Sequence, residues 1–458
     1  MGLALAGRAL PAAALETEHT GRPAIELLIR EGPSQAAPLR PATPGLGSVL
    51  NGWSPSGTLS APRDGRANAP SSARRYERYE GPLSGLETRL FADAADGRWD
   101  AHSLLAASLV ASGVSDPAAL GRHQARFAEL VAELRRSGRV TGPPRQQAQA
   151  VFEFMHRRML CGGYQLDGTD LAALLDQGRF NCVSASVLFN CLAGELGLSA
   201  CGLEIPGHAL SRLLLPDGNL DVETTCPEWF RLLDDPRKQA ELVARTLGPQ
   251  RAAGRAEDRR QVSDVELVAT IYYNRGVDLL GQKRFADAVA ANAKALRLDP
   301  HSQTARGNLL ATLNNWAIAE AAPGRYDQAA ELLRQGMAID PGYETFKANY
   351  RHVHREWTDR LCRMDQFSAA LAVLVRAAQE CPGDPTFTPA RLDVYRCWAR
   401  HLFESGRRDE GSAVLAQARR ELGELAQAAD LEMAEAAGGL GVPSQRAGNT
   451  LPARRAAQ

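Results

Sequence analysis

The sequence predicts an α+β protein, in which a small sheet lies within a helical N-terminal part and an all-α array of repeats follows. Three observations support this fold class. Apolar residues recur with a helical period between Leu83 and Leu160. Short strand-like runs separated by turn signals follow at 200–225. A regular repeat then occupies the C-terminal half of the chain.

Four helices are expected before the sheet, because Gly, Asp and Pro interrupt the helical pattern between them. The residues that precede these helices have a different composition. Pro, Gly, Ala and Ser recur without a period from Pro33 to Ser72, so this stretch can bury little apolar surface and is predicted to be disordered. The four expected helices are Leu83–Ala92, Ala101–Ser112, Pro117–Arg136 and Arg145–Leu160.

A cysteine is predicted at the start of the next helix. Asn181 is a good helix N-cap, and Cys182 after it opens an apolar run of helical period. In a first helical turn, unpaired N–H groups and the helix dipole favour a thiolate and lower the thiol pKa from its reference value of about 8.5. The same N–H groups are candidates for an oxyanion hole. The side chain of Gln177 is a further candidate donor, with a helix C-cap role as the alternative.

Three strands are expected after this helix. Pro206-Gly207 turns the chain before His208, and Pro216-Asp217-Gly218 is a strong hairpin signal. His208 therefore stands at the start of one hairpin strand, and two acidic residues lie on the other. The strands are Ala200–Ile205, Ala209–Leu215 and Asn219–Thr225.

The hairpin suggests which carboxylate accompanies the histidine. A pairing that is symmetrical about a two-residue Asp217-Gly218 turn puts His208, Asp221 and Glu223 on one face, because side chains alternate along a strand. Glu223 is nearer to His208 than Asp221 is, so we favour Glu223 and keep Asp221 as the alternative. A thiol, an imidazole and a carboxylate are what a nucleophile, its general base and the group that orients the base require.

This order of residues resembles the core of the transglutaminase-like superfamily, whose members share a papain-like Cys-His-Asp arrangement. The resemblance implies that Cys182 is the nucleophile, His208 the base and Glu223 the counterpart of the family's Asp. The family's Asp-Pro-Thr motif reads here as Glu223-Thr224-Thr225. It further implies a cysteine hydrolase or acyltransferase, without a cofactor, that hydrolyses, deamidates or transamidates protein or peptide amides. The upstream helices resemble a bacterial branch of the family that has an α-helical N-terminal region.

Two alternatives remain open. In the first, the domain is a catalytically inactive adaptor, and both it and the repeats bind proteins. The presence of both Cys182 and His208 favours an enzyme, because an inactive domain would be free to lose either residue. In the second, zinc is held by Cys182, Cys201, His208 and Cys226, although their spacing is irregular for a zinc site. We predict no metal and no other cofactor.

The C-terminal half repeats at an interval of 41 residues, which Pro300, Pro341 and Pro382 mark. In each unit an aromatic residue is followed by Ala three positions later and by a small residue seven positions further on. The pattern resembles the second helix of a tetratricopeptide repeat, although the interval exceeds the usual length of about 34 residues. The matching residues are Phe285, Ala288 and Ala295, then Tyr326, Ala329 and Gly336, then Phe367, Ala370 and Ala377.

A helical solenoid leaves a concave groove, so we expect a protein partner there. The basic helix at 347–363 contains Trp357, which suits either a groove for acidic peptides or, as the favoured alternative, a solvated face with Trp357 in the core. The predicted domains are a disordered segment at 1–80, the transglutaminase-like domain at 82–235 (helical part 82–162, core 163–235), a linker at 236–263, repeats at 264–437 and a disordered tail at 438–458.

Composition narrows the classes of partner. The chain has 53 basic and 53 acidic residues, so no net charge favours nucleic acid or an anionic membrane. No segment approaches the roughly 18 uncharged apolar residues of a membrane span. The eight cysteines show no CxxC and no regular pairing pattern, which favours a reducing cytoplasm. Secretion is the minor alternative, because Arg8 interrupts an N-terminal run that otherwise resembles a signal peptide.

Overall fold

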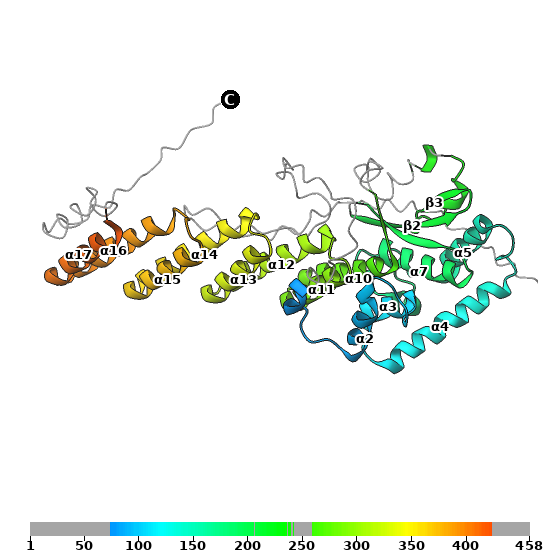
Figure 1. Ribbon diagram of the computed structural model, residues 1–458, viewed down its shortest axis with the longest axis horizontal. Coiled ribbons are helices and arrows are strands. Elements are labelled where there is room, and N and C mark those ends of the chain that lie inside the picture. Colours follow the sequence, from blue (N-terminus) through cyan, green and yellow to red (C-terminus); the bar gives the residue numbers. More distant parts are fainter. Residues whose placement is uncertain (1–73, 206, 236, 240, 242–258, 424–458) are drawn as a thin grey trace, which may run out of the picture. The chain divides into compact units, whose positions relative to one another are not determined.

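The computed structural model describes residues 74–423, apart from positions 206, 236, 240 and 242–258. The described part is α+β, as predicted: helices pack against one antiparallel sheet near the middle of the chain, and further helices follow it (Figure 1). Most of the predicted disordered segment, at 1–73, and the predicted tail at 438–458 lie outside the described residues. The repeats are described up to residue 423.

Most of the described α-helices before the sheet begin at a polar side chain that caps them, and the helix that starts at Pro144 is the exception. Ser84 and Glu87 form a capping box at the start of α2, and Asp116 accepts from two backbone N–H groups at the start of α4. The predicted helix Pro117–Arg136 is confirmed, and the other three differ from prediction by a few residues at their ends. The helices are α2 (Gly85–Asp93), α3 (Leu104–Ala111), α4 (Pro117–Arg136), α5 (Pro144–Arg158), α6 (Leu171–Gln177) and α7 (Cys182–Glu195).

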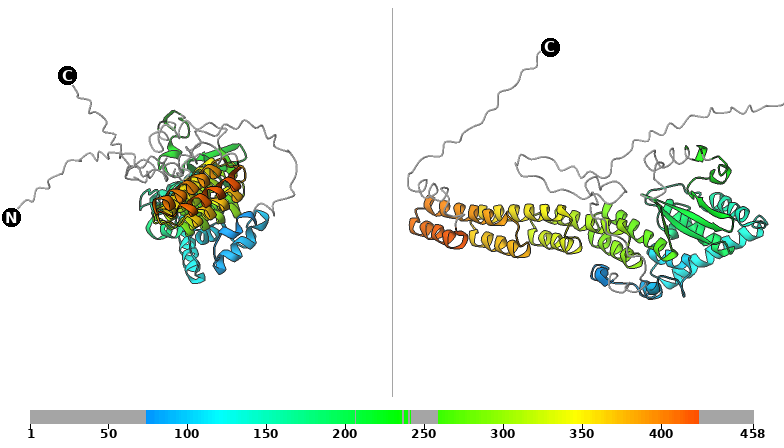
Figure 2. Two further views of the ribbon diagram at one scale, coloured as in Figure 1. Left: turned by 90° about the vertical axis from the view of Figure 1, so that its left-hand side faces the viewer. Right: turned by 45° about the horizontal axis from the view of Figure 1, so that its top comes forward.

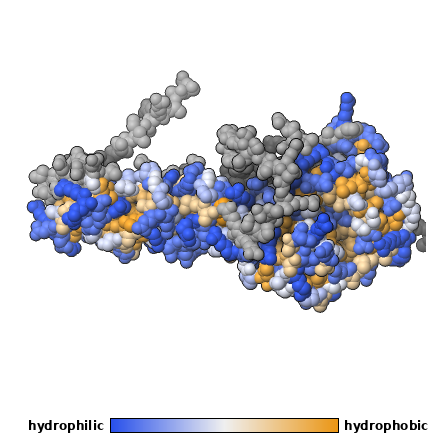
Figure 3. All heavy atoms as spheres, in the orientation of Figure 1, coloured by the Kyte–Doolittle hydropathy of each residue, from blue (hydrophilic) through white to orange (hydrophobic). Residues whose placement is uncertain are grey.

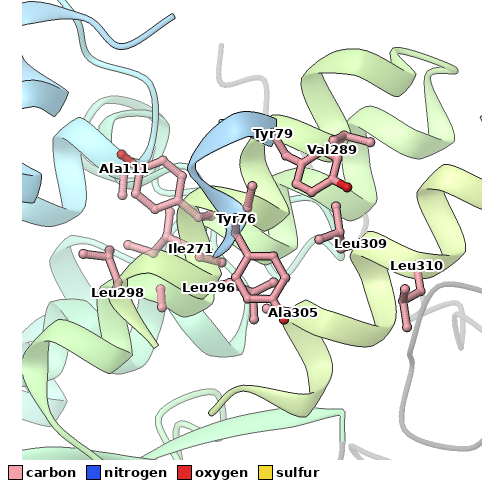
Figure 4. Packing of buried hydrophobic residues seen from close by; sticks show 14 of the residues in the cluster. Tyr76, Tyr79, Ala111, Ile271, Val289, Leu296, Leu298, Ala305, Leu309 and Leu310 are labelled. Carbon is pink, nitrogen blue, oxygen red and sulfur yellow. The ribbon is translucent and has the colours of Figure 1, made fainter. Parts of the chain in front are cut away.

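Residues 74–80 are ordered, which corrects the predicted boundary of the disordered segment at 80. They form the short helix η1 (Arg74–Tyr79), and its Tyr76 and Tyr79 are buried against helix α11 (Phe285–Leu298), as Figure 4 shows. Glu80 is also buried and accepts a hydrogen bond from Arg297 of α11 at 2.8 Å. The two tyrosines supply the apolar surface that the residues before them lack.

The sheet has the order β3-β2-β1-β4. Leu215 pairs with Gly218, so the hairpin turn is Pro216-Asp217 and not the predicted Asp217-Gly218. Gly218 has φ 130°, a conformation that favours glycine. The register moves by two residues, so the residues that share a face stay the same. The strands are β1 (Ala200–Ile205), which is confirmed as predicted, β2 (His208–Leu215), β3 (Gly218–Val222) and β4 (Arg260–Val262).

The edge strand β4 lies at the end of the segment 236–263, which was predicted to be a linker. The prediction is therefore wrong for residues 260–262, which belong to the sheet. It pairs antiparallel with β1, with Val262 opposite Gly202. A Cβ atom at Gly202 would lie 2.5 Å from Val262 and 2.9 Å from Leu267, so glycine is what allows this close approach. Only Val262 of the strand is fully buried. The polar, Arg-rich sequence around it therefore carries almost no strand signal.

The repeats are helix pairs, of which four are described, and each pair packs against the next. Small residues allow the close helix crossings: a Cβ atom at Gly336 would lie 2.2 Å from the ring of Phe346. A Cβ atom at Gly411 would likewise lie 2.6 Å from the ring of Phe403. The pairs are α10 (Asp264–Gly281) with α11, α12 (Gln303–Ala321) with α13 (Tyr326–Ile339), α14 (Glu344–Arg363) with α15 (Phe367–Glu380), and α16 (Phe387–Glu404) with α17 (Arg408–Leu422).

A second periodic feature joins the helix pairs. Tryptophans recur at the same interval of 41 residues, and each stacks on the aromatic residue that begins the preceding pair's second helix. Trp357 also receives the Arg376 guanidinium at 5.6 Å, so the structure favours a packing role for Trp357 over the acidic-peptide groove. The stacked pairs are Phe285–Trp316, Tyr326–Trp357 and Phe367–Trp398, with ring centroids 6.3, 6.4 and 6.0 Å apart.

The first helix pair shares its core with the N-terminal helices. Tyr272 of α10 stacks on Phe91 of α2 at 5.9 Å, and Arg275 donates to the carbonyl of Ala111 in α3 at 2.5 Å. Helix α10 also packs on α7 and β1 (Figure 2). The predicted boundary at 264 therefore does not separate two independent cores.

The surface is mixed in character. In the face shown in Figure 3, hydrophilic residues separate the apolar ones, and no continuous apolar belt is visible. None of the helices in the described part of the chain combines the length and apolar character that a bilayer crossing requires.

Candidate functional site

Cys182 is the first residue of α7. The Asn181 side chain caps the helix and accepts from the N–H groups of Val183 at 2.9 Å and Ser184 at 3.1 Å. The N–H of Cys182 itself makes no hydrogen bond within the described residues. An open backbone donor and the positive end of the helix dipole therefore lie beside the Cys182 sulfur.

The loop at 166–169 holds the N-cap residue Asn181 in place. Asn181 donates through Nδ2 to the Thr169 hydroxyl at 2.6 Å and to the Leu166 carbonyl at 3.2 Å. The Ser184 hydroxyl donates to the Gly168 carbonyl at 2.6 Å. These bonds, two of which are buried, tie the loop at 166–169 to the first turn of α7, and so they hold Cys182 in place.

His208 and Glu223 form a buried pair. Nε2 of His208 lies 2.7 Å from Oε2 of Glu223, and the two side chains are 1% and 0% exposed. Strand β3 ends at Val222, so Glu223 lies just past the strand. Because the chain leaves the strand here, the Glu223 carboxylate reaches His208. Glu223 is the carboxylate that the sequence favoured over Asp221.

Glu223 is itself held in place by its neighbours. Its Oε1 accepts from the Thr225 N–H at 3.0 Å and from the Thr225 hydroxyl at 2.6 Å. The hydroxyl of Thr224 is hydrogen-bonded to the hydroxyl of Ser186 on α7, at 2.9 Å. The turn that carries Glu223 is thereby fastened to the helix that carries Cys182.

The thiol and the imidazole influence each other's protonation. Burial by itself would raise the pKa of the Cys182 thiol, but the neighbouring His208, together with the Ala209 N–H, lowers it below its ordinary value. Burial would likewise lower the pKa of His208, but Glu223 and Cys182 outweigh it and raise the pKa to about 10. These directions favour a thiolate-imidazolium pair near neutral pH.

The second ring nitrogen of His208, Nδ1, is not engaged by Glu223. Nε2 is occupied by Glu223, and the buried Nδ1 makes no hydrogen bond among the described residues. The Cys182 sulfur is the group whose interaction with the ring affects both pKa values. A thiol, an imidazole and a carboxylate in this arrangement are what a nucleophile, a proton carrier and an orienting group would need.

Asp221, the alternative carboxylate, is engaged elsewhere. Both of its oxygens accept from Arg212, at 2.6 and 3.0 Å, and Oδ2 also accepts from Arg259 at 3.0 Å. The structure thus brings Glu223 to His208 and places Asp221 in a partly exposed ion-pair cluster.

Gln177 lies at the exposed end of α6, and the following Gly178 caps that helix with φ 71°. Its role as an oxyanion donor stays a prediction. The residues of the zinc alternative do not form a ligand set: within the described residues, no three His, Cys, Asp or Glu side chains are grouped to hold a metal ion. The Cys201 thiol instead points to the Arg212 carbonyl, at 3.7 Å.

A cavity of about 390 Å³ lies on the second helix pair, between α12 and α13. Its lining includes Trp316, Glu320 and Glu331. None of the residues considered for catalysis lines it, so this cavity is separate from the Cys182 site.

His156 of α5 is a site neighbour that the sequence reasoning missed, since a single histidine on an amphipathic helix carries no motif. Its ring lies 4.5 Å from that of Phe152. Burial lowers the pKa of His156 to about 4, even though the neighbouring Thr224 backbone and the charges of Glu228 and Glu223 oppose this effect. His156 therefore supports the turn carrying Glu223 as a neutral ring.

Replacing this residue tests that assignment. A histidine whose folded pKa is depressed contributes stability above its unfolded pKa of about 6.5, and this stability is lost as the pH falls through about 4. Between pH 7.5 and 4, the free energy of unfolding should therefore fall more for the unchanged chain than for His156→Gln, by about 2–3 kcal/mol. Urea unfolding at both pH values measures this difference. Equal losses in the two chains would contradict a buried neutral His156.

Comparison with known proteins identifies no family and no relative. No model of a known protein family matches the chain, and no curated protein matches it.

Proposed function

We propose that the protein is a cysteine-dependent acyltransferase or hydrolase of the transglutaminase-like type, acting on protein or peptide amides. One observation carries the proposal: Cys182 at a helix N-terminus interacts with a buried His208, whose other ring nitrogen is 2.7 Å from Glu223. A thiolate nucleophile requires this set of neighbours.

In the first half of the reaction, the Cys182 thiolate attacks the carbonyl carbon of a glutamine side chain or a peptide bond. The new C–S bond forms as the carbonyl π electrons move to oxygen. The His208 imidazolium then gives its proton to the leaving nitrogen as the C–N bond breaks. Ammonia or an amine departs, and a thioester remains on Cys182.

In the second half, water or a primary amine attacks the thioester. His208, now neutral, takes a proton from the attacking group, and Glu223 stabilises the imidazolium that forms. Cleavage of the C–S bond restores the thiolate. Water gives hydrolysis or deamidation, and an amine gives transamidation.

The negative oxygen that develops in each half needs hydrogen-bond donors. The N–H of Cys182, which has no partner in the described part of the chain, is the first candidate because it sits at the helix N-terminus. Gln177 remains the second candidate.

The helix pairs after the sheet support a binding role beside the chemistry. We propose that they are tetratricopeptide-like repeats that hold a protein partner or the protein substrate in their groove. None of the eight cysteines, all of which lie in the described part of the chain, forms a disulfide. This state suits a reducing cytoplasm, where we place the protein.

Turnover of a glutamine-peptide library, with and without a primary amine, tests the proposal. The unchanged chain should release ammonia or form an amine adduct, and Cys182→Ala should do neither while keeping its fold. Product formation by Cys182→Ala at the same rate would refute the mechanism. If the unchanged chain binds library peptides but never turns them over, the inactive adaptor is the better account.

A further inference from the structure

We propose that the first helix pair, α10–α11, is part of the catalytic unit, and that Tyr273 and Arg260 are positioning residues for His208. This inference rests on the proposed function. It means that the repeats begin inside the active centre instead of being a separate binding arm.

Glu204 occupies a sensitive place in β1. It lies opposite Ala209, and the next residue along, Ile205, lies opposite His208. Because Ile205 pairs directly with His208 across the hairpin, a shift of Glu204 displaces His208 as well. Ala209 would move with it, and the N–H of Ala209 contributes to lowering the pKa of Cys182.

Two side chains hold the Glu204 carboxylate. The Tyr273 hydroxyl of α10 donates to Oε1 at 3.1 Å. Arg260 of β4 donates to Oε2 through Nη2 at 2.7 Å and through Nε at 3.1 Å. Both oxygens of Glu204 are therefore engaged by residues beyond the β1–β2 hairpin.

Arg260 is in turn anchored on the first helix pair. Its Nη1 donates to Glu266 of α10 at 3.2 Å, and its Nη2 donates to Asp299 at the end of α11 at 2.5 Å. The Asp299 side chain is 2% exposed. A buried carboxylate that faces an arginine strongly favours one geometry, because separating the two would leave an unpaired buried charge. The helix pair thus fixes Arg260, and Arg260 helps to fix Glu204.

Tyr273 also lies close to the chemistry. Burial raises its pKa well above the ordinary value, and the negative charges of Glu204 and Cys182 raise it further. A thiolate at Cys182 therefore affects the Tyr273 hydroxyl. Tyr272, the preceding residue, donates its hydroxyl to Glu87 of α2 at 3.3 Å, on the side of the N-terminal helices.

Adjacent tyrosines with different partners allow a matched test in the full-length chain. The measurement is the rate at which iodoacetamide alkylates Cys182 between pH 5 and 9, read by peptide mass spectrometry. Tyr273→Phe should slow alkylation at pH 6 about three- to tenfold, because His208 is held less well beside the thiol. Tyr272→Phe loses a comparable hydroxyl bond and should leave the rate unchanged. A purely structural role would affect the melting temperatures of both variants but not the pH profile of Cys182.

Two further variants separate the possible failures. Glu204→Gln keeps the shape of the side chain and should slow alkylation in the same direction, so it decides the question if Tyr273→Phe does not fold. Unchanged pH profiles in both Tyr273→Phe and Glu204→Gln would overturn this inference. If alkylation is also unchanged in His208→Gln, the proposed function itself fails.

Discussion

Glu223→Gln is expected to lower the alkylation rate of Cys182 at neutral pH by about a hundredfold or more. The amide keeps the size of the carboxylate but carries no charge. Burial alone would lower the pKa of His208, and Glu223 is the first group that opposes burial and helps raise that pKa to about 10. Without the carboxylate, the imidazolium is lost near pH 7, and the thiolate loses the charge that stabilises it.

The matched control is Asp221→Asn, which neutralises the other acidic residue of the same hairpin. Within the described residues, the Asp221 carboxylate accepts from Arg212 and Arg259, and it is partly exposed. We expect its alkylation profile to stay within about twofold of the unchanged chain, since partly exposed ion pairs have small effects. A larger loss in Asp221→Asn than in Glu223→Gln would mean that the orienting carboxylate has been assigned to the wrong residue.

Gly168→Ala is expected to destabilise the chain by about 3 kcal/mol or more and to abolish the reactivity of Cys182. A Cβ atom there would lie 2.5 and 2.6 Å from the backbone carbon and oxygen of Phe180, and 2.9 Å from the carbonyl of Gln165. Backbone atoms cannot rotate away as a side chain can. The loop would therefore shift, and the Gly168 carbonyl would leave Ser184 in the first turn of α7.

Urea unfolding and Cys182 alkylation measure the two effects of Gly168→Ala. The control is Gly121→Ala in α4, where nothing lies within 4 Å of the added Cβ atom. Since alanine is the better helix former, Gly121→Ala should stabilise the chain by about 0.5–1 kcal/mol and leave alkylation unchanged. Equal stability of the two variants would contradict the close packing at Gly168.

The sequence predicted those parts of the site that depend on residues close to one another along the chain. Asn181 is a strong N-cap residue, so the helix start at Cys182 was visible in the sequence, and the structure shows this cap. Side-chain alternation put His208 and Glu223 on one face, and this reasoning survives the change of hairpin register because the register moved by an even number. The turn after Val222 that completes the contact has no comparable sequence signal.

Long-range packing could not be predicted in the same way. Periodicity indicates that one face of α10 is buried, but not that α2, α3 and the sheet cover it. Tyr273 therefore looked like an ordinary repeat residue, and Arg260 looked like part of a linker. The tryptophans at 316, 357 and 398 share the interval of the repeat. Their stacking partners follow from it only once the order of the helix pairs is known.

The most direct test of the central claim is the pH dependence of alkylation at Cys182 and Cys161 within one unchanged chain. Cys161 is an exposed thiol in the same domain, so it controls for reagent and conditions. Since His208 lowers the pKa of Cys182, we predict that at pH 6 Cys182 is alkylated faster than Cys161. A Cys182 rate at pH 6 no higher than that of Cys161 would contradict the thiolate-imidazolium pair, and with it the proposed enzyme.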